Sequence, residues 1–512
     1  MAARGGTGKI SHACIYLANI FSAMVVRNKI KKILLIGDVG GNNAFHVGDE
    51  AMLEANLALL RRLLPGAEVI LVSRTPASTS QLYGAEASAT LGFSNVSADR
   101  EEELQRIDAL VERALGNGDE IPDVFQNLLT ANLLIISGGG NLSSTWPEHI
   151  LERLALVRLA RRCGIPIVIV GQTIGPNLEH ADRLLVMEIL DAARWVGLRE
   201  VPSVALAIEL GIPLEKIDYQ LDDALFLAGR PCHHLWPRNS DGVEHRLVIA
   251  ITLHQFVAAS SHAPVLDQLA GELDRLVEQS GAHLLFIPHL KLVGEDGNHG
   301  DRAMGEGLAA RMRHAKSITV LDVQGARETV WLTQKASMIL SSRYHPIVFG
   351  LAAQRPCLAL HVDAYTHIKL QGALIHAGMG EEYLHPLGEA CIAGIAERAM
   401  SILLRREECG EQLKRNLDAW QRAEHDREKR LSRLLKGLSP KRDRVAHDCM
   451  LGLARTLAQR SGDDPGGWKK RGLVRELTHW RATAEAAVEY ARSLEAARSE
   501  LAEHAGNRAE EQ

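Results

Sequence analysis

The sequence Ile33-Leu34-Leu35-Ile36 is followed directly by Gly37-Asp38-Val39-Gly40, and an amphipathic stretch covers residues 51–64. A run of apolar residues without polar alternation indicates a strand buried on both faces, as in a parallel sheet. The glycines permit a tight loop after the strand, and the spacing in 51–64 predicts a helix. This strand–loop–helix unit predicts an α/β fold.

The same unit recurs along the chain in two series. Apolar runs predict further strands at 69–72, 133–137, 167–171 and 196–198, with helical patterns between them. Residues 230–245 are rich in Pro, Asn and Gly and predict a linker. The rhythm then restarts with predicted strands at 248–253, 284–288, 318–321, 337–341 and 357–360. We therefore expect two facing Rossmann-like domains, at 31–229 and 246–386, with a ligand cleft between them.

The two ends of the chain differ from this pattern. Residues 1–30 form an N-terminal extension whose apolar segment 10–26 is interpreted as soluble, with a signal anchor or membrane-surface helix as the alternative. Residues 387–461 predict a charged helical region. In the helical tail 468–512 a heptad series (Leu473, Trp480, Ala487, Leu494, Leu501) predicts a coiled coil that joins copies or a partner. The alternative is a helix packed on its own chain.

Composition excludes several classes of function. A net charge of -5 and only 4% aromatic residues argue against nucleic acid as a partner. The seven cysteines are scattered without a C-x-x-C pair, which argues against a disulfide framework or a zinc site and fits the reducing cytoplasm. We expect no metal and no bound cofactor.

The segment Ser341-Ser342-Arg343-Tyr344-His345-Pro346 ends the predicted strand 337–341. Ligands of open parallel sheets bind at the carboxyl ends of strands. Arg343 offers a permanent cation and His345 a proton-transfer group, with an ordinary pKa of about 6.5. This pair indicates chemistry on an anionic substrate. The alternative is a structural ion pair and a capping histidine.

Other polar or glycine-rich segments also follow predicted strands. Ser137-Gly138-Gly139-Gly140-Asn141 predicts close passage of a ligand or of another chain segment. Gln172 suits a carboxylate or hydroxyl. Arg199 and His289 follow strands in the same way, with structural pairing to Glu200 and a turn histidine as their alternatives. Lys369 is a candidate phosphate contact.

Two loops have more than one interpretation. Asp49 opens the helix after the first loop, where it either caps the helix or binds sugar hydroxyls. The loop lacks the G-x-G-x-x-G spacing and the Walker lysine of nucleotide-binding loops. The glycine-rich segment 294–300 is interpreted as a lid or a solvated turn.

Taken together, these segments resemble the polysaccharide pyruvyl transferase family over residues 32–385. The resemblance is carried by an ordered set of motifs: Gly48-Asp49-Glu50, Ser137 to Asn141, Gly171-Gln172-Thr173-Ile174-Gly175-Pro176, Leu198-Arg199-Glu200, Leu221-Asp222-Asp223-Ala224, Ser342-Arg343-Tyr344-His345 and Tyr365-Thr366-His367-Ile368-Lys369. It implies a fold like that of the GT-B glycosyltransferases. It also implies transfer of a pyruvyl group from phosphoenolpyruvate, a co-substrate, to a sugar of a cell-envelope or secreted glycan or its precursor.

The resemblance implies a role for each candidate residue. His345 and Arg343 are the expected catalytic residues. The donor is expected to contact Arg199, Gly139, Gly140, Gln172, His289 and Lys369. The acceptor sugar is expected to contact Asp49, Glu50 and Asn141. We expect the enzyme in the cytoplasm, with peripheral contact at the inner membrane face as an open alternative.

Two departures from the family pattern stand out: residues 40–47 lengthen the first loop, and Pro346 follows the histidine. Two other functions remain as alternatives. One is a nucleotide-sugar glycosyltransferase of GT-B architecture. The other is a non-catalytic scaffold for glycan assembly that recruits partners through its tail.

Overall fold

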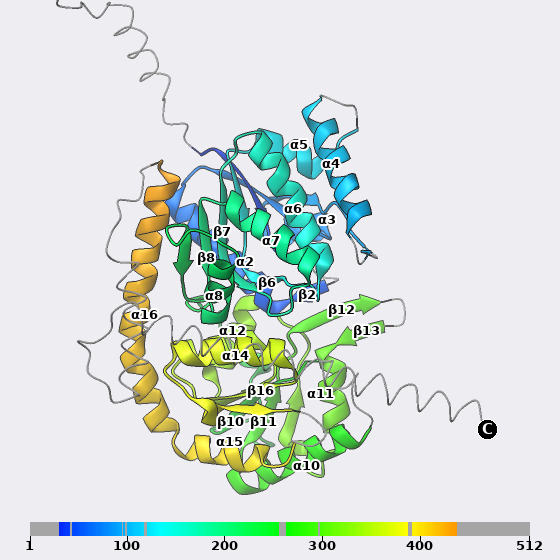
Figure 1. Ribbon diagram of the computed structural model, residues 1–512. Coiled ribbons are helices and arrows are strands. Elements are labelled where there is room, and N and C mark those ends of the chain that lie inside the picture. Colours follow the sequence, from blue (N-terminus) through cyan, green and yellow to red (C-terminus); the bar gives the residue numbers. More distant parts are fainter. Residues whose placement is uncertain are drawn as a thin grey trace, which may run out of the picture.

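The computed structural model of the protein describes residues 30–40, 44–94, 96–97, 100–116, 120–254, 263–294, 297–387 and 392–437. The N-terminal extension and the predicted coiled coil lie outside the described residues. Two α/β domains stack with their sheets separated by a layer of loops and helices (Figure 1). This architecture confirms the predicted pair of Rossmann-like domains in the GT-B arrangement.

The N-terminal sheet is parallel and has the order β4-β3-β1-β5-β7-β8-β9, with β6 paired to β7. Its strands are β1 (Lys32–Ile36), β3 (Glu68–Ser73), β4 (Glu86–Ala89), β5 (Leu133–Ile136), β6 (Gly139–Leu142), β7 (Ile167–Ile174), β8 (Trp195–Leu198) and β9 (Ile217–Tyr219). The apolar runs predicted β1, β3, β5, β7 and β8. The edge strands β4 and β9 were not predicted, because each is short and only partly buried.

Helices cover both faces of this sheet: α2 (Val47–Leu63), α3 (Pro76–Tyr83), α4 (Glu101–Leu115), α5 (Asp123–Thr130), α6 (Pro147–Arg162), α7 (His180–Ala192) and α8 (Val201–Glu209). Successive side chains of a strand point to opposite faces. Accordingly, Ile33 and Leu35 of β1 pack in one core cluster with Leu53 of α2, whereas Leu34 and Ile36 pack in another with Leu154 of α6. Burial on both faces explains the continuous apolar pattern of these strands.

The C-terminal sheet is also parallel, in the order β14-β11-β10-β15-β16-β17. Its strands are β10 (Val248–Thr252), β11 (His283–Phe286), β14 (Ile318–Val320), β15 (Met338–Ser341), β16 (Cys357–His361) and β17 (Leu384–Pro386). The surrounding helices are α10 (Ala263–Ser280), α11 (Asp301–Ala309), α12 (Ala326–Lys335), α13 (Tyr344–Ala352), α14 (Ala364–His376) and α15 (Ile395–Leu404). Single 3-10 turns occur at η2 (His233–Leu235), η3 (Ala315–Ser317) and η4 (Glu381–Tyr383).

A small antiparallel sheet joins the two domains. Strand β2 (Ala44–His46) from the first loop pairs with β12 (Leu290–Gly294), which forms a hairpin with β13 (Gly297–Gly300). The amide of Val47 also donates to the carbonyl of His289 over 2.9 Å. The lengthened first loop therefore supplies a contact between the domains. Within the glycine-rich segment, Gly297–Gly300 form β13 of this hairpin, and residues 295–296 lie outside the described residues.

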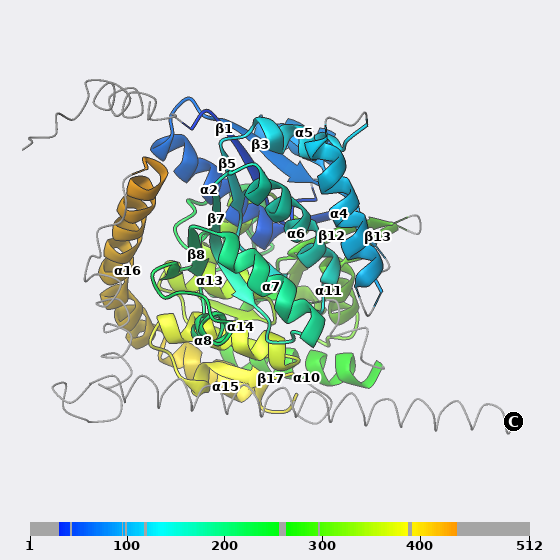
Figure 2. The ribbon, with the colours of Figure 1, turned by 45° about the horizontal axis from the view of Figure 1, so that its top comes forward.

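A long helix, α16 (Arg406–Leu435), runs back from the C-terminal to the N-terminal domain along one side of both (Figures 1 and 2). Its Leu413 and Trp420 pack in the C-terminal core, and its Leu431 packs beneath the N-terminal sheet. Arg427 and Arg430 pair with Asp223 and Asp218 of the N-terminal domain. Among the described helices, none is long and apolar enough to cross a membrane.

Candidate active site

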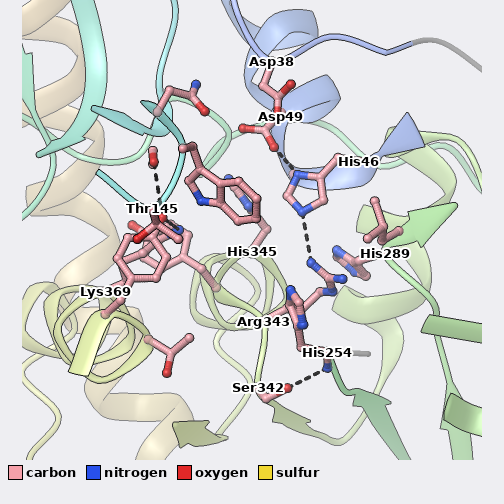
Figure 3. Close-up of a pocket in the computed structure, with 18 of the residues that line it drawn as sticks. Asp38, His46, Asp49, Thr145, His254, His289, Ser342, Arg343, His345 and Lys369 are labelled. Atoms are coloured by element: carbon pink, nitrogen blue, oxygen red, sulfur yellow. Dashed lines mark hydrogen bonds and ion pairs between the residues drawn. The ribbon is translucent and has the colours of Figure 1, made fainter. Parts of the chain in front are cut away.

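A cavity of about 440 Å³ lies between the two domains. The strand order of each sheet reverses once, between β1 and β5 in the first and between β10 and β15 in the second. Loops diverge at such switch points and leave a crevice for ligands. Asp38 follows β1, His254 follows β10 and Arg343 follows β15, and all three line the cavity (Figure 3). The fold therefore brings two ligand crevices together face to face.

His345 enters the cavity from the first turn of α13, which begins at Tyr344. Pro346 occupies the same first turn, where the backbone N–H has no partner in the helix and proline is tolerated. The imidazole is 6% exposed, and its Nε2 lies 3.7 Å from Asp222 Oδ2. Burial, followed by the charge of Arg199, holds the pKa of His345 well below its ordinary value. The histidine is therefore neutral in the free protein near pH 7, unlike the unperturbed imidazole that we expected.

Arg343 is held in place by Asp301 of α11. Its Nε and Nη2 donate to the two carboxylate oxygens over 2.6 and 2.5 Å. Its Nη1 lies 3.1 Å from Nε2 of His46, whose Nδ1 faces Asp49 (Figure 3). Because a guanidinium only donates, Nε2 of His46 accepts and Nδ1 carries the proton toward Asp49. This chain of side chains crosses from one domain to the other.

Asp49 belongs to the first turn of α2 but does not cap it; His46 occupies the N-cap position. Burial alone raises the pKa of Asp49. The interaction with His46, together with the charge of Lys369, overcomes this and holds the pKa below its usual range. Asp49 is therefore an ionised carboxylate in the cavity wall.

Arg199 is fully buried at the end of β8 and also lines the cavity. Its Nη1 donates to Asp222 over 2.7 Å, and its Nε donates to Glu200 and Thr173, each over 3.0 Å. Its Nη2 has no hydrogen-bond partner among the residues that the structure describes. Arg199 therefore has both the structural pairing and the cavity position that the sequence left open.

The glycine runs allow segments of the chain to approach closely. A Cβ atom on Gly48 would overlap with His345, and one on Gly140 would overlap with the Tyr365 hydroxyl. Gly139 has a φ of 141°, which disfavours any side chain. Gly140 lines the cavity beside Tyr365 and Lys369, whereas Gly139 does not.

The structure brings most of the predicted site residues together. The cavity lining includes Arg199, Arg343, His345, His289, Lys369, Gly140, Asp49 and Asn141. Gly139, Gln172 and Glu50 lie outside it. Gln172 is fully buried and donates to the carbonyl of Ser137, while Glu50 accepts from Tyr83 and from the amide of Gly40. Their ligand roles remain predictions.

Several lining residues were not among the predicted site residues: Asp38, His46, Arg74, Trp146, His149, His254, Tyr344 and Tyr365. Asp38 lies in the glycine-rich loop after the first predicted strand, and Tyr344 and Tyr365 lie in two of the family motifs. His46 lies in the lengthened first loop and reaches the cavity through strand pairing. Within the described ranges, no group of three or more His, Cys, Asp or Glu residues is arranged to hold a metal ion.

A family model for polysaccharide pyruvyl transferase matches residues 46–363, from the end of β2 to the residue before α14, and includes most of the residues that line the cavity. The chain belongs to the polysaccharide pyruvyl transferase family. This confirms the resemblance of its motifs. No curated protein matches the chain.

Solved structures similar to this pyruvyl transferase family member have low sequence identity. A putative UDP-N-acetylglucosamine 2-epimerase from Listeria monocytogenes is 12% identical, with a TM-score of 0.49 over 75% of this chain and 90% of that chain. UDP-GlcNAc 2-epimerase from Neisseria meningitidis, bound to UDP-GlcNAc, is 13% identical, with a TM-score of 0.47 over 75% of this chain and 94% of that chain.

Proposed function

We propose that the protein transfers the pyruvyl group of phosphoenolpyruvate to two hydroxyls of a sugar and forms a cyclic ketal. The observation that carries the proposal is a set of buried nitrogens on residues that line the cavity. Arg199 Nη2, His289 Nε2 and His345 Nε2 have no hydrogen-bond partner in the described part of the chain. Buried polar atoms normally have partners, so these nitrogens are expected to meet a ligand that supplies acceptors.

Phosphoenolpyruvate carries a carboxylate and a phosphate, and both groups are acceptors. Arg199 offers its unpartnered Nη2, and Lys369 adds a cation from α14 of the C-terminal domain. Arg343 is already paired with Asp301, so it contributes a fixed dipole and the one guanidinium nitrogen turned toward His46. These cations and hydrogen-bond donors favour binding of a small dianionic or trianionic donor over a bulky neutral one.

His345 is the proposed proton donor. A bound carboxylate and phosphate favour the imidazolium, so the neutral side chain takes up a proton as the donor binds. This proton then moves to the methylene carbon, which becomes a methyl group, while a sugar hydroxyl attacks C2. The C2–O bond to phosphate breaks as the second hydroxyl closes the ring. Of the two hydroxyl protons released, one restores His345 and the other leaves with phosphate.

Asp49 is the proposed contact for the attacking sugar. Its carboxylate is ionised and lines the same cavity as His345. Asn141 lies nearby with an amide nitrogen that has no partner among described residues. We further propose that the acceptor is a cytoplasmic precursor of a cell-envelope or secreted glycan.

Release of inorganic phosphate tests the proposed function. Purified protein is incubated with phosphoenolpyruvate and a panel of glycosides, and the products are analysed by mass spectrometry for an added pyruvyl ketal. Sugar-dependent release that is lost in His345→Ala supports the proposal. Thermal stabilisation by UDP-sugars, without any response to phosphoenolpyruvate, would instead favour a nucleotide-sugar glycosyltransferase.

A further inference from the structure

The N-terminal wall of the cavity carries an aromatic side chain beside carboxylates. It comprises Trp146, Asp38, Glu148 and His149. We propose that this wall, named the acceptor wall, binds an uncharged pyranoside, with Trp146 as a stacking platform and Asp38 as the acceptor for sugar hydroxyls. The proposal rests on the proposed function and assigns its second substrate to a subsite.

Trp146 immediately precedes α6, lines the cavity and is 37% exposed. Indole rings combine a large apolar face with a polar edge and contribute strongly to ligand binding in such positions. The C–H face of a pyranose ring is apolar and flat enough to stack on an indole. An exposed indole beside carboxylates therefore fits a sugar better than it fits phosphoenolpyruvate.

Asp38 lies at the end of β1 between the guanidinium of Arg74 and the imidazole of His149. One carboxylate oxygen accepts from Nη2 of Arg74 over 2.5 Å, and the other lies 3.9 Å from Nε2 of His149. The second oxygen is therefore held loosely enough to accept a hydroxyl proton. A carboxylate has several lone-pair positions and binds vicinal hydroxyls well.

The orientation of His149 is set from behind by Arg153, which is fully buried. Nη1 of Arg153 lies 3.4 Å from Nδ1 of His149 and donates to its carbonyl oxygen over 3.0 Å. Since a guanidinium cannot accept, Nδ1 must be the accepting nitrogen and Nε2 carries the proton toward Asp38. Burial, mainly, also lowers the pKa of His149 and keeps the ring neutral. Arg153 is a positioning residue that acts through His149.

The charge of the acceptor wall selects the class of sugar. Asp38, Glu148 and the nearby Asp49 are carboxylates, with Arg74 and Arg153 close to Asp38 and Lys369 close to Asp49. The proposed function assigns Lys369 and Arg343 of the C-terminal domain to the anionic donor, which leaves the carboxylates of the acceptor wall to accept from hydroxyls and favours a neutral sugar over an anionic one. A cavity of about 440 Å³ falls within the range that accommodates ligands larger than phosphoenolpyruvate.

Saturation-transfer NMR tests the acceptor wall without turnover. The probes are the methyl α- and β-glycosides of glucose, galactose, mannose and N-acetylglucosamine, with methyl glucuronide as the charged comparison, each with and without phosphoenolpyruvate. We expect binding of at least one neutral glycoside in preference to the glucuronide. Trp146→Ala should weaken it about tenfold, Trp146→Tyr should restore most of it, and Asp38→Asn should weaken it while sparing donor affinity.

Phe226→Ala is the matched control, because Phe226 is 38% exposed and lies outside the cavity lining. Donor affinity is measured by calorimetry and separates this proposal from the proposed function. A wild-type protein that does not bind phosphoenolpyruvate contradicts the proposed function but not the acceptor wall. Melting temperatures show whether a variant is folded. The acceptor wall is refuted if Trp146→Ala and Phe226→Ala bind glycosides equally. It is also refuted if the wild type binds no glycoside or prefers the glucuronide.

Discussion

Gly48 of the N-terminal domain lies directly against His345 of the C-terminal domain, with no space for a side chain between them. The glycine lies in the first turn of α2, and the histidine lies in the first turn of α13. The position of the proposed proton donor therefore depends on the absence of a Cβ atom in the facing domain. This relationship gives the Gly48-Asp49-Glu50 motif a packing role beside its chemical one.

Gly48→Ala is expected to displace His345 and to lower phosphate release by about 100-fold, as loss of a general acid does. Overpacking at a buried position also costs about 1–3 kcal/mol of stability. The control is Gly271→Ala in α10, where a Cβ atom meets open space and helix propensity favours alanine. The expectation fails if both variants keep wild-type turnover. Turnover and thermal melting are the measurements.

Arg199→Ala is expected to destabilise the fold as well as to weaken donor binding. Removing the guanidinium leaves Glu200 and Asp222 buried without their partner, which costs roughly 3–5 kcal/mol. Arg199→Lys retains the charge and should lose donor affinity with a smaller drop in melting temperature. Arg183→Ala breaks an exposed pair with Glu209 and serves as the control. Equal melting temperatures for Arg199→Ala and Arg183→Ala would show that Arg199 is not a structural cation.

Donor binding is expected to take up protons through His345. The pKa of His345 is well below its ordinary value in the free protein, owing to burial and Arg199. A bound anion raises that pKa, so affinity should increase as the pH falls toward it. Calorimetry at pH 7 in buffers of different ionisation enthalpy counts the protons. His345→Asn provides the baseline for titration of the donor phosphate itself, and identical proton uptake by both proteins contradicts the mechanism.

Arg427→Met is expected to loosen α16 from the N-terminal domain. Burial raises the pKa of Asp223 to about 6, although Arg427 lowers it. Without Arg427, the carboxylate of Asp223, which lies close to Gly171, loses its 3.2 Å ion pair. The free energy of unfolding should therefore fall by about 3 kcal/mol. Arg422→Met, on the exposed face of the same helix, should change the melting temperature little. Chemical denaturation of both variants measures the difference.

The architecture was predictable because buried parallel strands have a local signature. The apolar runs at β1, β5, β7, β10 and β15 are continuous, since both faces of each strand are covered. The polar or glycine-rich segments after these strands predicted Arg343, His345 and Arg199 as cavity residues. They did so because the carboxyl ends of parallel strands share one edge of a sheet, where ligands bind.

The sequence by itself determined the two α/β domains and the family, and most of the site residues that it predicted do line the cavity, because strand burial and strand-end chemistry are local properties of the chain. Only the tertiary structure decided the pairing of β2 with β12, the Asp301–Arg343 bond and the contact of Gly48 with His345. It also decided that Glu50 and Gln172 lie outside the cavity lining and that Trp146 lies within it. These features join segments far apart in the chain, and their partners follow from how the two domains pack rather than from any local pattern.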